Sequence, residues 1–389
     1  MSSAADRLPP ATGAWQEGDD PAWRKFADLG QLELEFGKSL PNVRVAYETW
    51  GEISQARDNA VLLQHALTAD AHAVGPARPG QPTEGWWSDV VGPGKALDTN
   101  RWFVVAGNVL GGCQGTTGPS SLAPDAEPWG SRWPRISIRD QVAAEVGLAD
   151  YLGIDRFAFV IGGSMGGMRS LEWAVAHQDR LNAAVILACG AVATADQIAT
   201  QTAQIQAITL DPYWNGGDYH GAPEGQGPHR GMGIARRFAH RSYRTESEFA
   251  ERFGNQPQPG EDAYSSLIPG VNADAGRFAV SSYLDYQADK LAWRFDAGTY
   301  VALTDAMNTF DVGRGRGGVA SALASIDRPV AVAGLSSDRL YPLYLQRDLA
   351  DQIPTVAGLQ VIESPFGHDG FLLESQAVGA IVGRALARN

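Results

Sequence analysis

The chain has 389 residues, of which 44% are hydrophobic and 19% charged, which is the composition of a folded globular protein. Its 31 basic and 44 acidic residues give a formal net charge of −13, which argues against a nucleic-acid-binding surface. Residues 1–20 contain no apolar signal segment, and no run of about 18 apolar residues follows, so neither secretion nor a membrane span is expected. Two cysteines, Cys113 and Cys189, are too few for a disulfide framework, which favours the reducing cytoplasm.

The first half of the chain contains short strand patterns. Alternating apolar and polar residues at 32–36 and 43–47 predict two antiparallel strands with one side in solvent. Compact apolar runs then predict strands that are buried on both faces, at 60–63, 102–105, 157–161 and 184–187. Such strands, separated by long connections, are typical of a parallel sheet with helices on both sides. The fold class is therefore expected to be α/β, with a mostly parallel sheet.

Helical patterns replace the strand patterns after residue 192. A helix is expected at 195–210, and a capping box begins another at Thr245. Strand patterns return at 329–333 and 359–362, and a last helix is expected at 377–387. We therefore predict a core formed by residues 1–190 and 320–389, interrupted by a helical lid insertion of residues 191–319.

A G-x-S-x-G motif follows the predicted strand at 157–161 and opens a helix-forming segment. Its fixed members are Gly162, Ser164 and Gly166. This context is that of a nucleophile elbow, in which a strained turn exposes the serine hydroxyl at a helix N-terminus. Glycines are needed because side chains there would strike the neighbouring strand and helix. Ser164 is the predicted nucleophile; the alternative is a glycine-rich turn with an incidental serine.

An activated serine needs a base and a carboxylate that orients the base. His368 lies in a loop directly after the last predicted strand, and Asp338 follows the strand that ends near residue 335. The chain order Ser164, Asp338, His368 is that of α/β-hydrolases. All three residues fall at the carboxyl ends of strands, where open α/β sheets place their sites. The remaining histidines lack metal-ligand spacing such as H-E-x-x-H, so no metal site is predicted.

The oxyanion hole is expected to combine two backbone N–H groups. One belongs to Met165, the residue after the serine, and the other to the loop at 65–70, within which the residues alone do not select a donor. Cys113 is an alternative nucleophile by residue type. It lies outside any elbow, however, and free thiols are ordinary core residues.

Several motifs occur together between about residues 40 and 373: HALT at 65–68, WWSDVVGPGK at 86–95, NVLGGC at 108–113, GTTGPSS at 115–121, GGSMGG at 162–167 and GHDG at 367–370. This set resembles the homoserine O-acetyltransferases, which are α/β-hydrolase-fold acyltransferases of methionine biosynthesis. The resemblance implies ping-pong transfer of an acetyl group from the co-substrate acetyl-CoA to the hydroxyl of L-homoserine, through an acyl-serine. It implies no permanently bound cofactor, and it suggests a homodimer, as does the apolar insertion.

The resemblance also assigns roles to individual residues. It makes Ser164, Asp338 and His368 the catalytic triad, Leu67 and Met165 the oxyanion donors, and Arg236, Tyr243 and Asp369 the substrate-binding residues. Arg236 and Tyr243 are seven positions apart, about two helical turns, which would place both on nearly one helix face. The residues alone favour a different interpretation, in which the arginines between 236 and 244 form a solvated basic face.

Fold and triad together do not separate a transferase from a serine esterase that uses water as the acceptor. The Arg236 and Tyr243 face on an inserted lid favours the transferase, because transfer requires a bound acceptor and exclusion of water. A succinyl donor or a serine acceptor stays open, so a homoserine O-succinyltransferase and a serine O-acyltransferase are further alternatives. A non-catalytic binding protein would need a broken triad, and no position of it is broken.

Overall fold

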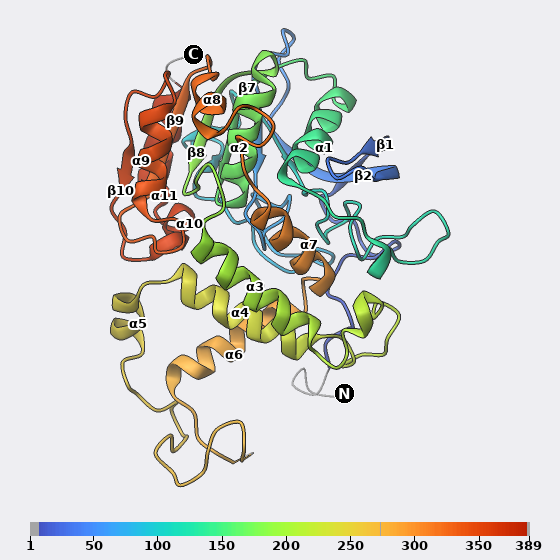
Figure 1. Cartoon of the computed structure of the whole chain (residues 1–389), viewed down its shortest axis with the longest axis vertical. Coiled ribbons are helices and arrows are strands. Elements are labelled where there is room, and N and C mark those ends of the chain that lie inside the picture. The colour runs from blue at the N-terminus through green and yellow to red at the C-terminus, as the bar shows by residue number, and fades with distance from the viewer. Residues whose placement is uncertain (1–7, 273, 387–389) are drawn as a thin grey trace.

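A computed structural model describes residues 8–272 and 274–386. Its main sheet runs through the middle of the molecule with the strand order β1-β2-β6-β3-β7-β8-β9-β10 (Figure 1). β2 pairs antiparallel with β1 and β6, and all later neighbours pair parallel. The strands are β1 (Lys25–Glu33), β2 (Ser39–Trp50), β3 (Ala60–Gln64), β6 (Phe103–Gly107), β7 (Phe157–Gly163), β8 (Leu181–Leu187), β9 (Val330–Leu335) and β10 (Gln360–Ile362), with β4 (Val91–Gly92) and β5 (Leu97–Asp98) in a separate pair.

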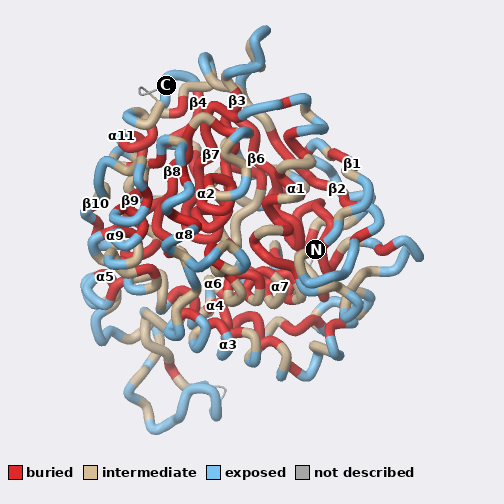
Figure 2. Tube along the Cα trace, turned by 45° about the horizontal axis from the view of Figure 1, so that its top comes forward, coloured by how far each residue is buried: buried red, intermediate tan, exposed pale blue. Residues whose placement is uncertain are grey.

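Helices cover both faces of this sheet, since its central strands are apolar on both sides. On β3, Leu62 belongs to the core shared with α1, α2, α8 and α9, whereas Leu63 belongs to the core shared with α11. Figure 2 shows the central strands buried between these layers. The mostly parallel α/β prediction is confirmed. The flanking helices are α1 (Ile138–Tyr151), α2 (Met165–Ala176), α8 (Val319–Ala324), α9 (Leu343–Gln352), α10 (Gly370–Leu373) and α11 (Ser375–Leu386).

The chain between β8 and β9 is helical and adds no strand to the main sheet within the residues described. Its helices α3, α4 and α6 lie together beneath the sheet in the view of Figure 1, and the loop between α5 and α6 extends away from them. The helices are α3 (Ala195–Thr209), α4 (His229–Tyr243), α5 (Glu246–Arg252), α6 (Ala279–Ala292) and α7 (Ala297–Asn308). Short 3-10 turns complete the fold: η2 (Gly130–Arg132), η3 (Gln178–Arg180), η4 (Asn215–Gly217) and η5 (Gly367–Asp369).

The first hairpin differs from the sequence prediction. β1 ends at Glu33, so most of the strand predicted at 32–36 lies in a turn. The Leu34 N–H donates to Lys38 O at 2.8 Å, and Gly37 has a φ of 80°, a conformation that suits glycine in a turn. The strand begins instead at Lys25, where the polar side chains of an edge strand conceal the apolar pattern.

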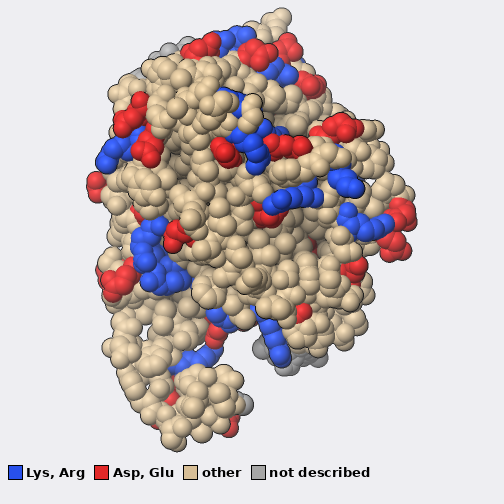
Figure 3. Space-filling model, viewed as in Figure 1, with Lys and Arg blue, Asp and Glu red and all other residues tan. Residues whose placement is uncertain are grey.

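The distribution of charge on the surface and the lengths of the helices bear on two expectations from composition, that the chain has neither a basic nucleic-acid-binding face nor a membrane span. Basic and acidic side chains are interspersed on the face shown in Figure 3, without a continuous basic area. In residues 8–272 and 274–386, no helix combines the length and the apolar character needed to cross a bilayer.

Candidate active site

Ser164 occupies the turn between β7 and α2. Its φ of 59° and ψ of −123° form a conformation that L residues rarely adopt. The residue is 7% exposed, and its N–H donates to Leu187 O at the end of β8 at 3.1 Å. The turn therefore has the geometry of a nucleophile elbow, with the serine at the N-terminus of α2.

Close backbone packing explains the glycines of the elbow. A Cβ atom on Gly162 would lie 2.3 Å from backbone atoms of Gly166, and one on Gly166 would lie 2.0 Å from Gln64 O. Both separations are far shorter than van der Waals contact. The elbow helix consequently packs directly against the end of β3, where the predicted oxyanion loop begins.

The loops after β9 and β10 bring Asp338 and His368 together. His368 Nδ1 lies 2.7 Å from Asp338 Oδ2, and both residues are buried. The two loops are also joined to each other, because Ser337 Oγ donates to Ser364 O at 2.5 Å and accepts from the Gly367 N–H at 3.0 Å. These hydrogen bonds between the two loops therefore fix the distance between the Asp338 carboxylate and the His368 imidazole.

The surroundings of His368 fix its proton on Nδ1. Burial alone would lower the pKa of His368, but the Asp338 and Asp369 carboxylates outweigh burial, and the pKa is raised above 6.5. Asp338 Oδ1 accepts the N–H groups of Leu340 and Tyr341 at 2.9 and 2.8 Å, which prevents the carboxylate from turning. His368 Nε2 has no hydrogen-bond partner in the described part of the chain. That nitrogen is the one through which a histidine accepts a serine proton.

Ser164 and His368 line one cavity of about 240 Å³, together with Leu67. Leu67 is the second residue of a turn closed by the Ala69 N–H and Ala66 O at 3.1 Å, and such a turn leaves the N–H of its second residue unused. Met165 is fully buried at the start of α2. The two predicted oxyanion donors thus follow β3 and β7, which are neighbours in the sheet.

Arg236 and Tyr243 reach the same cavity from α4. Arg236 is only 9% exposed, and its Nη1 donates to Thr68 Oγ1 at 3.3 Å. Its guanidinium carbon lies 6.0 Å from the centre of the Tyr243 ring. A solvated basic face is therefore the wrong interpretation for Arg236.

The end of α4 rests on the loop that carries His368. A Cβ atom on Gly367 would lie 2.5 Å from Tyr243 O, so the two backbones are in close contact. Asp369 pairs with Arg244 at 3.2 Å and also lines the cavity. The structure thus gathers the three predicted substrate-binding residues around Ser164.

The sequence analysis missed Arg294, which follows the end of α6. Its side chain lines the cavity, and its Nη1 donates to Thr68 O at 2.7 Å. Burial, with repulsion from Arg236, lowers the pKa of Arg294 to about 10, so it stays charged at neutral pH. The Nε atoms of Arg294 and Arg236 are buried without a partner among the described residues. The sequence offered one weak signal for Arg294: Lys290 lies one helical turn earlier and also lines the cavity.

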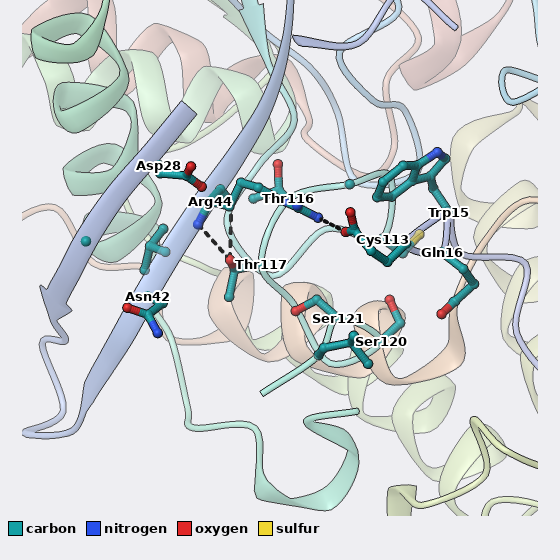
Figure 4. A pocket seen from close by; sticks show the side chains of 15 residues that line it. Trp15, Gln16, Asp28, Asn42, Arg44, Cys113, Thr116, Thr117, Ser120 and Ser121 are labelled. Atoms are coloured by element: carbon teal, nitrogen blue, oxygen red, sulfur yellow. Dashed lines mark hydrogen bonds and ion pairs between the residues drawn. The ribbon is translucent and has the colours of Figure 1, made fainter. Parts of the chain in front are cut away.

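Other reactive side chains fit the chemistry less well. His240 lines the cavity, but burial and nearby arginines lower its pKa to about 2, which makes it a poor base. Cys113 lies in another cavity, of about 410 Å³, beside Trp15 and Thr117 (Figure 4). Burial raises the pKa of Cys113 to about 12, so its thiol is protonated. The described residues contain no group of three or more His, Cys, Asp or Glu that could hold a metal ion.

Known proteins resemble this chain over nearly its entire length. The family described as alpha/beta hydrolase fold matches residues 59–375. The homoserine O-acetyltransferase of Thermobifida fusca (strain YX) is 57% identical, covering 97% of this chain and 98% of its own. That of Mycobacterium tuberculosis (strain ATCC 25177 / H37Ra) is 56% identical over 92% of each chain.

Solved structures show the same architecture. Esterase E22, 26% identical, has a TM-score of 0.83 and covers 93% of this chain and 99% of its own. Homoserine O-acetyltransferase from Bacillus anthracis, 24% identical, also has a TM-score of 0.83, covers 94% of this chain and 98% of its own, and supports the fold. With more than half of its residues identical to those of its curated relatives, this chain is an acyltransferase of the α/β-hydrolase fold and belongs to the homoserine O-acetyltransferase family.

Proposed function

We propose that this enzyme transfers the acetyl group of acetyl-CoA to the side-chain hydroxyl of L-homoserine, in methionine biosynthesis, through an acetyl group carried by Ser164. The observation that carries the proposal is one cavity in which Ser164 and His368 of the sheet meet Arg236 of α4. The names of the relatives supply the homoserine acceptor and the acetyl group, and the motif resemblance implies acetyl-CoA as the donor. The cavity supplies a nucleophile, a base and a cation for an amino-acid acceptor.

The lining of the cavity suits a zwitterion. Arg236 and Arg294 present two guanidinium groups to the cavity, and guanidinium groups bind carboxylates well. The two positive charges repel each other, and a bound carboxylate would relieve that repulsion. Asp70 and Asp369 present carboxylates in the same cavity, which suit an ammonium group. Water makes none of these paired contacts, so the lining favours a bound amino-acid acceptor over hydrolysis.

The chemistry proposed for these residues has two half-reactions. First, Ser164 Oγ attacks the thioester carbonyl as His368 Nε2 takes its proton, and the N–H groups of Leu67 and Met165 stabilise the oxyanion. The C–S bond then breaks, and His368 returns the proton to the CoA thiolate. In the second half-reaction His368 removes the homoserine hydroxyl proton, and the homoserine oxygen attacks the carbonyl carbon of the acetyl-serine. The bond between that carbon and Ser164 Oγ then breaks, and His368 returns the proton to Ser164 Oγ. Asp338 stabilises the imidazolium in both half-reactions.

Measuring CoA thiol release with and without L-homoserine tests this function. Release that depends on homoserine, with an equal amount of acetylated homoserine, supports it. Equal release without homoserine, with acetate as the product, would support an esterase, the second candidate, which the structural likeness to esterase E22 favours. Succinyl-CoA and L-serine in the same assay test the other donor and acceptor.

Residues 191–319 are proposed to act as a lid over this cavity, on a core of residues 1–190 and 320–389. Two contacts support a lid: the end of α4 packs on the His368 loop, and Arg294 binds the loop after β3 through Thr68 O. No permanently bound cofactor is part of this proposal. A cytoplasmic location is proposed because Cys113 and Cys189 are both free thiols.

We expect Arg236→Ala to reduce homoserine-dependent turnover at least about tenfold, because it removes a charge-assisted contact with the acceptor carboxylate. Formation of the acetyl-enzyme should continue, since that step needs the triad and the oxyanion donors. The slow loss of acetyl-enzyme to water should stay the same or rise, because an empty acceptor site admits solvent. Stopped-flow measurement of acylation and transfer separates these effects.

Arg241→Ala is the matched control, because Arg241 lies on the same helix but is exposed. It should change neither step. Arg236→Lys should restore little activity, since lysine lacks the planar fork of arginine. Equal losses of acylation and transfer in Arg236→Ala would show that Arg236 only supports the fold or binds the donor.

A homodimer is proposed to form through the exposed apolar side chains of α4 and α6. Phe238 and Tyr286 are 50% and 61% exposed. The residues directly before them, Arg237 and Asp285, form an ion pair that joins the two helices. Phe238→Asp should halve the mass seen by light scattering, because a charge is costly in an apolar interface. Tyr151→Asp, at a 54% exposed position on α1, should leave the mass unchanged. A monomeric wild-type protein would contradict the proposal.

A further inference from the structure

His65, the first residue of the oxyanion loop, makes two ring hydrogen bonds in the interior. It is 1% exposed, and its Nδ1 lies 2.8 Å from Ala66 O. On the other side of the ring, Nε2 accepts the Val109 N–H at 3.0 Å. A carbonyl oxygen can only accept and an N–H can only donate, so Nδ1 carries the proton and Nε2 carries none. The two contacts together define one tautomer.

Electrostatics keep this ring neutral. Burial lowers the pKa of His65 to about 3, and the guanidinium of Arg169 acts in the same direction. Arg169 is itself fully buried, forms an ion pair with Glu145 at 2.5 Å and donates a hydrogen bond to His65 O. The ring therefore keeps the same proton arrangement throughout the neutral pH range, and it does not act as a base.

The oxygen that accepts the Nδ1 proton, Ala66 O, belongs to the peptide bond between Ala66 and Leu67. Ala66 O and the Leu67 N–H are parts of one amide group, and no peptide bond among the described residues is cis. In a trans amide the C=O and the N–H point in opposite directions. A hydrogen bond from the buried imidazole to Ala66 O therefore turns the Leu67 N–H away from His65, and it also polarises the amide so that this N–H becomes a stronger donor.

We propose that His65 is a positioning residue for the oxyanion hole: its Nδ1–H holds the Ala66–Leu67 peptide so that the Leu67 N–H faces the acyl group on Ser164. This rests on the proposed function only in taking Ser164 as the nucleophile and Leu67 as a donor. Arg169, on the elbow helix, holds the carbonyl of His65, and Gly166 packs against Gln64 O. The two oxyanion donors are thereby fixed relative to each other before any substrate binds, which is the condition for electrostatic stabilisation of the transition state.

Two substitutions separate the two ring contacts. His65→Asn places an amide N–H close to the position of Nδ1 and has no atom at the position of Nε2, whereas His65→Gln places its amide near Nε2 and loses the donor to Ala66 O. We expect His65→Gln to lower kcat by about 10- to 100-fold, with little change in KM for the acyl donor, and His65→Asn to keep most of the activity. A larger loss of kcat in His65→Asn than in His65→Gln would show that His65 serves only to hold Val109. Equal losses with a lowered Tm would show a packing role only; both results overturn the proposal.

A spectroscopic measurement reports on the oxyanion hole directly. Wild type and both variants are acetylated with p-nitrophenyl acetate, which needs no homoserine, and the stretching band of the acetyl-serine carbonyl is recorded by rapid-mixing infrared difference spectroscopy. Hydrogen bonds to the carbonyl lower its frequency, so His65→Gln should move the band upward and His65→Asn should leave it near the wild-type position. His177→Gln, at a half-buried histidine that ends the elbow helix, is the matched control and should not move the band.

The outcomes distinguish this proposal from the proposed function. A wild-type enzyme that forms the acetyl-serine but fails to acetylate homoserine would contradict the function and leave the band comparison intact. An unchanged band in His65→Gln would overturn the role of His65, whatever the acceptor proves to be. Absence of an acetyl group on Ser164 in the wild type would overturn both.

Discussion

Ser164→Ala is expected to lower acetyl transfer by a factor on the order of 10⁶, the scale seen when the serine of a hydrolytic triad is removed. Ser164 carries the hydroxyl in the elbow, and His368, the proposed base, lines the same cavity. Mass spectrometry of enzyme mixed with acetyl-CoA alone should show one added acetyl group on the wild-type peptide that contains Ser164. The variant should show none.

Cys113→Ala provides the control for this experiment, because Cys113 is the other nucleophile that the sequence offers. Its thiol is buried in a separate cavity and protonated, so the substitution should leave both the adduct and the turnover intact. An acetyl group on Cys113, or a Ser164→Ala enzyme that still becomes acetylated, would make the assignment of the nucleophile wrong.

Asp338→Asn is expected to lower turnover by about 10⁴-fold, as does the equivalent change in a serine protease triad. Asparagine keeps the shape of the side chain but presents an amide to His368 Nδ1, which favours the wrong tautomer and no longer stabilises the imidazolium. Binding of both substrates should change much less. Steady-state kcat and KM measure the two effects separately. A variant with near wild-type turnover would transfer the role to another carboxylate, and Asp369, which also raises the pKa of His368, would be the next to test.

The pH profile gives the same variant a second readout. The base must be neutral to accept a proton, and the pKa of His368 is raised above 6.5, so wild-type activity should fall as the pH drops through that raised value. In Asp338→Asn the main cause of the upward shift is gone and burial still opposes the charge. The acid limb of kcat/KM should therefore move to lower pH. A limb that stays in place would indicate that another group is titrating.

The sequence predicted the parts of this enzyme that local patterns specify. The buried strands at 60–63 and 157–161 have continuous apolar runs, and the elbow combines a motif with a strand and a helix, so each could be recognised within a short window. Asp338 and His368 were predicted as partners because each follows a strand, and their side chains do meet, at 2.7 Å. In contrast, β1 was misplaced, since an edge strand with polar side chains has a weak pattern.

Features that depend on tertiary contacts were outside the reach of sequence patterns. Arg294 belongs to none of the motifs recognised in the sequence. Only the packing of α6 beside the loop after β3 brings it to the cavity. Whether Arg236 is solvated or buried depends on how α4 is oriented. A pattern of charges in the sequence does not determine that orientation. His65 was visible as part of a motif, but its role depends on which atoms its ring nitrogens meet.

The backbone of Ser164 places stability and activity in conflict during evolution. An L residue held at a φ of 59° and a ψ of −123° costs about 1–3 kcal/mol. The free energy of unfolding of a folded domain is only about 5–15 kcal/mol, so the strain at this one position is a substantial fraction of it. Glycine would adopt the same turn without that strain, and selection for stability alone would favour it. Serine at this position therefore persists in a lineage only while its chemistry is under selection, and a copy released from that selection should lose Ser164 early.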